Sequence, residues 1–209
     1  MFVKLIDSMG TDLTVVNAAR VSFDKHHKIF TGGDEKLIAY LARHGHWTPF
    51  GHPQLQFRIY APIFVARQLV KHQVGLVWNE VSRRYVDNKP AFYMTDKWRS
   101  KAEDKKQGSG DTLIDLEGED YDHIQTALMV ASDTYMHLLR IGVAPEQARM
   151  VLPQATYTEW YWTGSLYAFA RICNLRISDD AQEETKEVAL MISNLINLKF
   201  PISWKYLIK

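Results

Sequence analysis

The hydrophobic pattern of the chain changes abruptly at Pro62, from the alternation of a strand to the spacing of a helix. Residues 54–60 alternate polar and apolar side chains, which is typical of a strand with one buried face. Proline is tolerated in the first turn of a helix, and apolar side chains then recur at helical spacing: Ile63, Ala66, Val70 and Val74. We therefore expect a strand that passes directly into a helix, with these apolar side chains on the buried face.

Strand and helix patterns also alternate along the rest of the chain, without the regular β-α-β spacing of a parallel sheet. We expect further strands at residues 2–8, 91–95 and 155–163. We expect further helices at residues 11–20, 35–43, 120–141, 145–151, 166–174 and 180–198. The interleaved elements and the length of 209 residues predict an α+β fold with a single domain over residues 1–209.

Residues 99–119 differ in composition from their surroundings. They are rich in charged residues, contain Gly and Ser, and have few large apolar side chains. Such a stretch has little apolar surface to bury against a core. We expect it to form a mobile surface loop within the single domain.

The charge balance argues against a nucleic-acid-binding protein. The 25 Lys and Arg residues nearly match the 24 Asp and Glu residues, for a formal net charge of +1, whereas proteins that hold duplex nucleic acid carry a broad positive surface. Asp7 interrupts the N-terminal sequence before a signal-peptide core can form, and no apolar run approaches the roughly 20 residues of a membrane span. We expect a soluble cytoplasmic protein without a nucleic-acid or membrane partner.

Several common cofactor sites are missing from the sequence. It contains neither the Gly-x-Gly-x-x-Gly fingerprint nor a Walker loop, so a nucleotide cofactor requires another binding mode. The histidines His44, His46 and His52 lack the spacing of a zinc site, and we expect no metal. Cys173 is the single cysteine, so an internal disulfide is excluded, and we expect its thiol to be buried and unreactive on a helix.

The residues around Lys71 form the strongest polar pattern in the chain. Arg67 and Lys71 lie one helical turn apart, with Gln68 and His72 beside them. This spacing predicts a cationic, hydrogen-bonding edge next to the buried face of the helix. Such an edge suits an anionic ligand.

Residues 79–85 follow after a short loop and have no helical period. An extended chain points alternate side chains the same way, so we expect Glu80, Ser82 and Arg84 on one side. A carboxylate, a hydroxyl and a guanidinium placed together can bind a sugar hydroxyl and clamp a phosphate. The alternative is that these side chains form a solvated surface or a structural ion pair.

These polar motifs resemble, in the same order along the chain, the motifs of the flavin-dependent thymidylate synthases. The central ones are Arg67-Gln68, Lys71-His72-Gln73 and Asn79-Glu80-x-Ser82-x-Arg84-Tyr85. Further blocks that resemble the family are His44-Gly-His-x-Thr-Pro-Phe50, Ala61-Pro-Ile-Phe-Val-Ala-Arg-Gln68, Ala148-Arg-Met-Val-Leu-Pro153 and Asn174-Leu-Arg176. The ordered set spans nearly the whole chain. The resemblance implies the fold of the thymidylate synthase-complementing proteins, a twisted antiparallel sheet flanked by helices.

The resemblance also implies an enzyme that uses FAD to methylate dUMP to dTMP. The implied carbon donor is 5,10-methylenetetrahydrofolate, the reducing equivalents come from NADPH, and uracil is activated without a covalent cysteine adduct. The implied assembly is a homotetramer whose sites are shared between subunits. The sequence agrees with this chemistry, because Cys173 lies in a segment with no sign of an activated thiol.

Individual residues receive roles by matching the motifs of the family. Arg176 resembles the arginine that favours the N3-ionised form of uracil, and it is the expected catalytic residue. The residues implied to bind dUMP are Gln68, Lys71, Glu80, Ser82, Arg84, Arg149 and Arg176. The residues implied to contact FAD are His46, Thr48, Lys71, His72, Gln73, Glu80, Ser165, Tyr167 and Arg171.

The chain departs from the family at its flavin-binding motif. Lys71-His72-Gln73 stands where the family has Arg-His-Arg, and the interval to Ser82 is one residue longer than usual. Lysine keeps the charge of arginine but loses its bidentate fork, whereas glutamine keeps hydrogen bonding but loses the charge. Arg171 and Asp180 also replace the common Asn and His of the family. We hypothesise that Arg171 supplies the positive charge missing at Gln73.

Two other functions are compatible with the same residues. One is a nucleotide-binding protein that keeps the dUMP pocket but has lost flavin catalysis through the changes at Lys71 and Gln73. The other is a helical interaction module in which the polar residues are unrelated surface charges. Alanine substitutions at these residues would then leave nucleotide binding unchanged.

Overall fold

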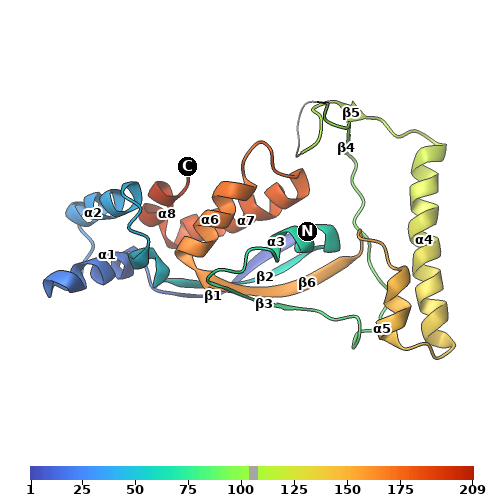
Figure 1. The fold of residues 1–209 in the computed structure, drawn as a ribbon, viewed down its shortest axis with the longest axis horizontal. Helices are drawn as coiled ribbons and strands as arrows, with labels where there is room; N and C mark the ends of the chain where they lie inside the picture. The colour runs from blue at the N-terminus through green and yellow to red at the C-terminus, as the bar shows by residue number, and fades with distance from the viewer. Residues whose placement is uncertain (104–107) are drawn as a thin grey trace.

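A four-stranded antiparallel sheet lies at the centre of the structure, a computed structural model that describes residues 1–103 and 108–209 (Figure 1). The strands of this sheet are β1 (Phe2–Met9), β2 (Gln54–Pro62), β6 (Tyr157–Ser165) and β3 (Leu76–Glu80), in that order across the sheet. A separate pair contains β4 (Trp98–Arg99) and β5 (Leu113–Ile114). The α-helices are α1 (Asp12–Arg20), α2 (Gly32–Arg43), α3 (Ile63–Leu69), α4 (Glu119–Arg140), α5 (Pro145–Ala148), α6 (Leu166–Arg176), α7 (Glu183–Lys199) and α8 (Pro201–Leu207). The predicted α+β class with an antiparallel sheet is confirmed.

The two central strands, β2 and β6, pair along their whole length, from Gln54 opposite Ser165 to Pro62 opposite Tyr157. Every second side chain points to the same face of the sheet, and on that face Phe57 and Trp162 are fully buried. Helices α3, α6 and α7 lie on this face and contribute to the core, together with residues of α1, α2 and α8 (Figure 1). The strand predicted from the alternation of residues 54–60 is confirmed.

Both central strands pass into a helix without an intervening loop. Pro62 ends β2 in an extended conformation, and α3 begins at the next residue. Ser165 ends β6, and its Oγ accepts a hydrogen bond from the backbone N–H of Ala168 at 3.2 Å, which caps α6. Because the strands are antiparallel, the two helices begin at opposite ends of the sheet and run back over the same face. The chain just after α3 lies beside α6, and His72 contacts Arg176, the last residue of that helix.

The helix after Pro62 is shorter than predicted. It ends at Leu69, so Lys71, His72 and Gln73 lie in a turn and a loop. Val74 was expected in the core, but its side chain is 73% exposed, and this prediction is wrong. Gly75 explains the difference, because its φ of 76° turns the chain back into β3, a conformation that strains residues with a Cβ atom.

A second glycine lets β3 approach β6 closely. A Cβ atom at Gly164 would overlap Leu76 Cδ2 and would lie 2.9 Å from the carbonyl oxygen of Gly75. Further along the pair, the rings of Trp78 and Trp160 stack with their centroids 4.4 Å apart. These contacts hold β3 at the edge of the sheet and thereby position the loop that precedes it.

Most other helices lie near their predicted positions, and the differences concern short elements. The strand predicted at residues 91–95 is reduced to a single bridge between Phe92 and Thr156. Helix α8 was not predicted. The segment 99–119 contains part of β4 and all of β5, residues 104–107 within it lie outside the described residues, and its mobility stays a prediction.

Helix α4 stands apart from the sheet, beside α5 (Figure 1). Within α4 only Ser132 and Tyr135 are buried, whereas Met129 and Val130 are more than half exposed. Although α4 has 22 residues, neither it nor any other helix formed by the described residues is apolar enough to cross a membrane.

Asp34 joins the two N-terminal helices through a buried carboxylate. It accepts hydrogen bonds from Arg20 Nη2 at 2.6 Å and from the hydroxyl of Thr31 at 2.8 Å, and His27 Nδ1 lies 3.0 Å away. Burial alone would raise the pKa of Asp34, but the hydrogen bonds from Thr31, Arg20 and His27 outweigh burial and hold the pKa far below its usual range.

We expect Asp34→Asn to lower the free energy of unfolding by about 3 kcal/mol, because Arg20 then loses its buried partner. Urea unfolding of both proteins measures this difference. A lowered pKa stabilises the fold above the ordinary aspartate pKa, and this stabilisation is lost as the pH falls. The difference should therefore shrink on acidification, and a difference independent of pH would contradict the role of the carboxylate. Asp87→Asn, at an exposed position, is the matched control.

Candidate active site

Three cavities hold most of the polar residues predicted from the sequence. The Glu80 cavity, of about 450 Å³, is lined by Glu80 and Arg149. The Tyr167 cavity, of about 700 Å³, is lined by His46, His72, Tyr167 and Arg171. The Arg176 cavity, of about 530 Å³, is lined by Gln68, Lys71 and Arg176. The residues implied to bind dUMP are thus divided between the Glu80 cavity and the Arg176 cavity, whereas a group of the implied FAD residues gathers in the Tyr167 cavity.

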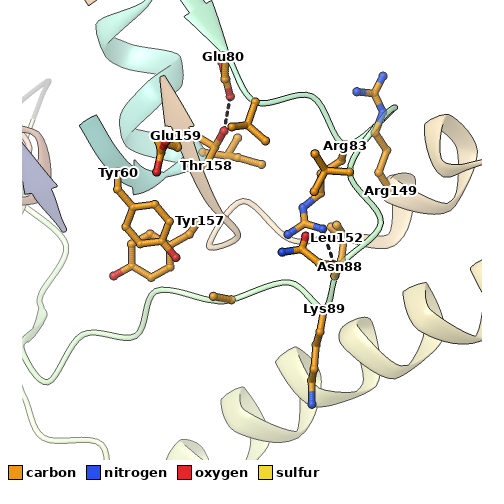
Figure 2. A pocket seen from close by; sticks show the side chains of 14 residues that line it. Tyr60, Glu80, Arg83, Asn88, Lys89, Arg149, Leu152, Tyr157, Thr158 and Glu159 are labelled. Atoms are coloured by element: carbon orange, nitrogen blue, oxygen red, sulfur yellow. Dashed lines mark hydrogen bonds between the residues drawn. The ribbon is translucent and has the colours of Figure 1, made fainter. Parts of the chain in front are cut away.

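The Glu80 cavity places a fixed carboxylate near an aromatic wall (Figure 2). Glu80 Oε1 accepts a hydrogen bond from Thr158 Oγ1 at 2.8 Å, which holds the carboxylate at the end of β3. The rings of Tyr60 and Tyr157 are stacked with their centroids 4.4 Å apart and form another wall. Arg149 lies on the opposite side of this view. A carboxylate, aromatic rings and a cation together suit a ligand that has hydroxyl and anionic groups.

The chain after Glu80 differs from the prediction. It leaves the extended conformation and forms a turn in which the backbone N–H of Tyr85 donates to the carbonyl oxygen of Ser82 at 2.9 Å. The extended conformation expected beyond Glu80 is therefore wrong, although Ser82 and Arg84 still lie together, with Arg84 Nε donating to Ser82 Oγ at 3.4 Å. Arg83 lines the Glu80 cavity, whereas Ser82 and Arg84 do not.

The Tyr167 cavity combines aromatic rings with cations. The rings of Trp47 and Tyr167 lie 5.8 Å apart between centroids, at an angle of 34°. Arg43, Arg171 and Lys209 also line the cavity, and none of its described lining residues is an aspartate or a glutamate. The wall therefore suits a planar aromatic ligand that carries negative charge.

The Arg176 cavity holds Gln68 in one orientation. The side-chain amide of Gln68 donates to Gln182 Oε1 and accepts a hydrogen bond from Thr185 Oγ1 at 3.3 Å. Both partners belong to the start of α7, and neither was predicted from the sequence. Lysine, arginine and an oriented amide at one cavity can bind an anion and a carbonyl group together.

Arg176 and His72 connect the Arg176 cavity with the Tyr167 cavity. Arg176 Nε donates a hydrogen bond to His72 Nε2 at 3.1 Å. Leu175 lines both cavities, so they meet beside this pair. Burial lowers the pKa of His72, and the positive charges of Arg176 and Arg171 lower it further.

Comparisons with known proteins identify the family of the chain. It matches the family model described as "Thymidylate synthase complementing protein" over residues 4–202. The chain belongs to the thymidylate synthase complementing protein family. It is 40% identical over 209 residues to the flavin-dependent thymidylate synthase of Thermosipho africanus, covering 100% of this chain and 91% of that protein. It is 39% identical over 203 residues to an enzyme of the same name from Thermus thermophilus, covering 97% of this chain and 74% of that protein.

The fold is similar to solved structures of a nucleotide methylase. The UMP/dUMP methylase PolB from Streptomyces cacaoi bound with 5-Br dUMP has a TM-score of 0.87 and 32% sequence identity, covering 98% of this chain and 93% of that one. The same methylase bound with 5-Br UMP has a TM-score of 0.83. The resemblance to this family and its fold, inferred from the ordered motifs, is confirmed.

Five of the residues expected to bind dUMP or FAD line none of the three cavities, and these are Thr48, Gln73, Ser82, Arg84 and Ser165. The structure gives some of them a local role. Ser165 caps α6, and the carbonyl oxygen of Gln73 accepts a hydrogen bond from the N–H of Leu76 at 3.2 Å. Their roles in ligand binding stay predictions.

Cys173 is enclosed in the core beneath α7. Its side chain is fully buried, and its thiol donates weakly to the carbonyl oxygen of Ala189 at 3.7 Å. Burial raises the pKa of this thiol well above its usual range, so the reactive thiolate is disfavoured. Cys173 lines none of the three cavities.

We expect iodoacetamide to leave Cys173 unmodified in the folded protein and to modify it after unfolding in urea. The reason is that alkylation requires an accessible thiolate. Mass spectrometry of the intact chain gives a clear result, because Cys173 is the single cysteine. Modification of the folded protein as fast as that of the unfolded protein would contradict its structural role.

Proposed function

We propose that this protein methylates dUMP to dTMP with FAD as its cofactor, 5,10-methylenetetrahydrofolate as carbon donor and NADPH as reductant, without a covalent cysteine adduct. The observation that carries this proposal is the meeting of the Tyr167 cavity and the Arg176 cavity at Leu175, with the cysteine enclosed elsewhere. The family and the names of the relatives support the reaction class. The bound 5-Br dUMP of the methylase neighbour supports the substrate class.

Arg176 is the proposed catalytic residue. Its Nε donates a hydrogen bond to His72 Nε2. Arg176 makes no other side-chain hydrogen bond to the described residues, so its Nη groups are available to a ligand. A guanidinium is always charged and would stabilise negative charge that develops on the uracil ring, favouring the N3-ionised form. Gln68 and Lys71 line the same cavity and would bind the nucleotide beside it.

The lining of the Tyr167 cavity fits FAD. Trp47 and Tyr167 offer aromatic faces to a planar ring system, and Arg43 and Arg171 offer positive charge to the phosphates. When bound, the flavin supplies hydride transfer and a carrier for the one-carbon unit. The protein residues around it would bind, orient and exclude water.

The division of the dUMP residues between two cavities supports the proposed homotetramer with shared sites. The Glu80 cavity and the Arg176 cavity have no lining residue in common. A small nucleotide that contacts both sets would be enclosed by two copies of the chain. The exposed Met129 and Val130 on the outlying helix α4 support such an assembly, because they offer apolar surface to a neighbouring subunit.

Tritium release from dUMP labelled at C5 tests the reaction when methylenetetrahydrofolate, NADPH and FAD are present. We expect Arg176→Ala to remain folded but to lose about 100-fold or more in turnover, because a charge-stabilising donor is removed. Cys173→Ala should retain turnover, because its thiol does not participate. Loss of turnover in a folded Cys173→Ala protein would contradict the mechanism. A colourless wild-type protein that binds dUMP would instead support the nucleotide-binding alternative.

We also expect Arg171→Ala to bind FAD about 10- to 100-fold more weakly than the wild type. Arg171 lines the Tyr167 cavity and is proposed to replace the charge missing at Gln73, and a charge-assisted hydrogen bond contributes about 1.5–3 kcal/mol. Flavin absorbance after gel filtration and titration with FAD both measure the effect. Arg140→Ala, an exposed position outside the three cavities, is the control. Equal flavin content in the two variants would refute the role of Arg171.

A further inference from the structure

The hydrogen bond between Arg176 and His72 determines which form of the histidine is present. An arginine side chain can only donate hydrogen bonds, so His72 Nε2 must be the acceptor, with Arg176 Nε at 3.1 Å. The imidazole is therefore neutral and carries its proton on Nδ1. A protonated imidazole would place two donors against each other and would break the contact.

The surroundings of His72 favour this neutral form. The charged groups that face it on α6 are Arg176 and Arg171, and burial together with these two charges lowers the pKa of His72. The other titratable groups around the Tyr167 cavity come from α2, from the loop that follows it, from α6, from α8 and from the end of the chain: Arg43, His46, Tyr167, Tyr206 and Lys209. No aspartate or glutamate among the described lining residues offsets these cations.

We propose that His72 is a positioning residue for Arg176, in addition to the flavin contact implied by its motif. Neutral His72 accepts the Nε proton of Arg176 and holds the guanidinium at the wall of the Arg176 cavity. The Nη groups then stay directed to the ligand that this cavity binds. This inference rests on the proposed function only in naming that ligand as the uracil ring of dUMP.

The position of the pair makes this role effective. His72 belongs to the turn after α3, and Arg176 is the last residue of α6, so the bond joins two elements that both run back from the central strands. An arginine side chain has several rotatable bonds, and ordering it on ligand binding opposes binding entropically. Because the hydrogen bond to His72 orders the Arg176 side chain before the ligand binds, much of this entropic cost is removed from the binding step. Protonation of His72 at acid pH would both break the bond and repel the guanidinium.

Two substitutions separate this role from a simple packing role. His72→Leu fills similar space but offers no acceptor, whereas His72→Gln can place its Oε1 near the original Nε2 and does not titrate. With FAD at saturating concentration, we expect His72→Leu to lower kcat about tenfold or more, with a smaller change in the KM for dUMP. His72→Gln should recover most of this loss. Circular dichroism and flavin content confirm that both variants are folded and loaded.

The pH dependence of kcat provides a second measurement. In the wild type, kcat should fall as the pH drops through the pKa of His72, which lies below the usual histidine value. In His72→Gln this acid limb should disappear, because no group at this position takes up a proton. An acid limb of equal position and depth in both proteins would overturn the proposal, as would a His72→Gln protein no more active than His72→Leu.

Nuclear magnetic resonance tests the same contact without turnover. In the purified protein labelled with ¹⁵N at histidine, the His72 signal is assigned by its loss in His72→Gln. We expect the Nδ1-protonated neutral form in the wild type and a higher pKa of His72 in Arg176→Gln, because a lowering charge is removed. Arg140→Gln should leave the His72 signal unchanged. A proton on Nε2, or no change in Arg176→Gln, would overturn the proposal, whereas failure to form dTMP in the wild type would overturn the proposed function alone.

Discussion

The antiparallel pairing of β2 with β6 sets the geometry of the site. Because side chains alternate between the two faces of a sheet, a shift of one residue in this register would expose Phe57 and Trp162 to solvent. Both strands continue directly into helices, so the register also determines where α3 and α6 begin. A shifted register would therefore separate His72 from Arg176. The same apolar burial that stabilises the sheet thus maintains the polar contact between the two cavities.

Charge in the Arg176 cavity is the second constraint. Arg67, Lys71 and Arg176 line it, and Asp180 is the one acid among its described lining residues. Like charges gathered at one cavity repel each other, and a bound anion reduces this repulsion. A positive charge on His72 would increase this repulsion. The cations of the cavity therefore favour the neutral imidazole.

The sequence predicted those parts of the fold that depend on local pattern. The alternation of residues 54–60 and the family motif at Arg176 were readable because each is carried by neighbouring residues. The end of α3 at Leu69 was not, because it depends on Gly75 and on the close approach of β3 to Gly164 far along the chain. The partners of Gln68 were missed for the same reason, since both come from the start of α7.

The polar motif of residues 67–85 is divided between two cavities because the chain reverses its direction at Gly75. The residues from Gln68 to Lys71 precede this reversal and remain with α6 and α7, whereas Glu80 follows it at the far end of β3. The motif therefore presents its two halves to different cavities of one subunit. Under the proposed function, a nucleotide that needs both halves would take them from different copies of the chain. Closeness in the sequence would then reflect a site completed by assembly, and the Glu80 carboxylate would serve a neighbouring subunit's Arg176 cavity.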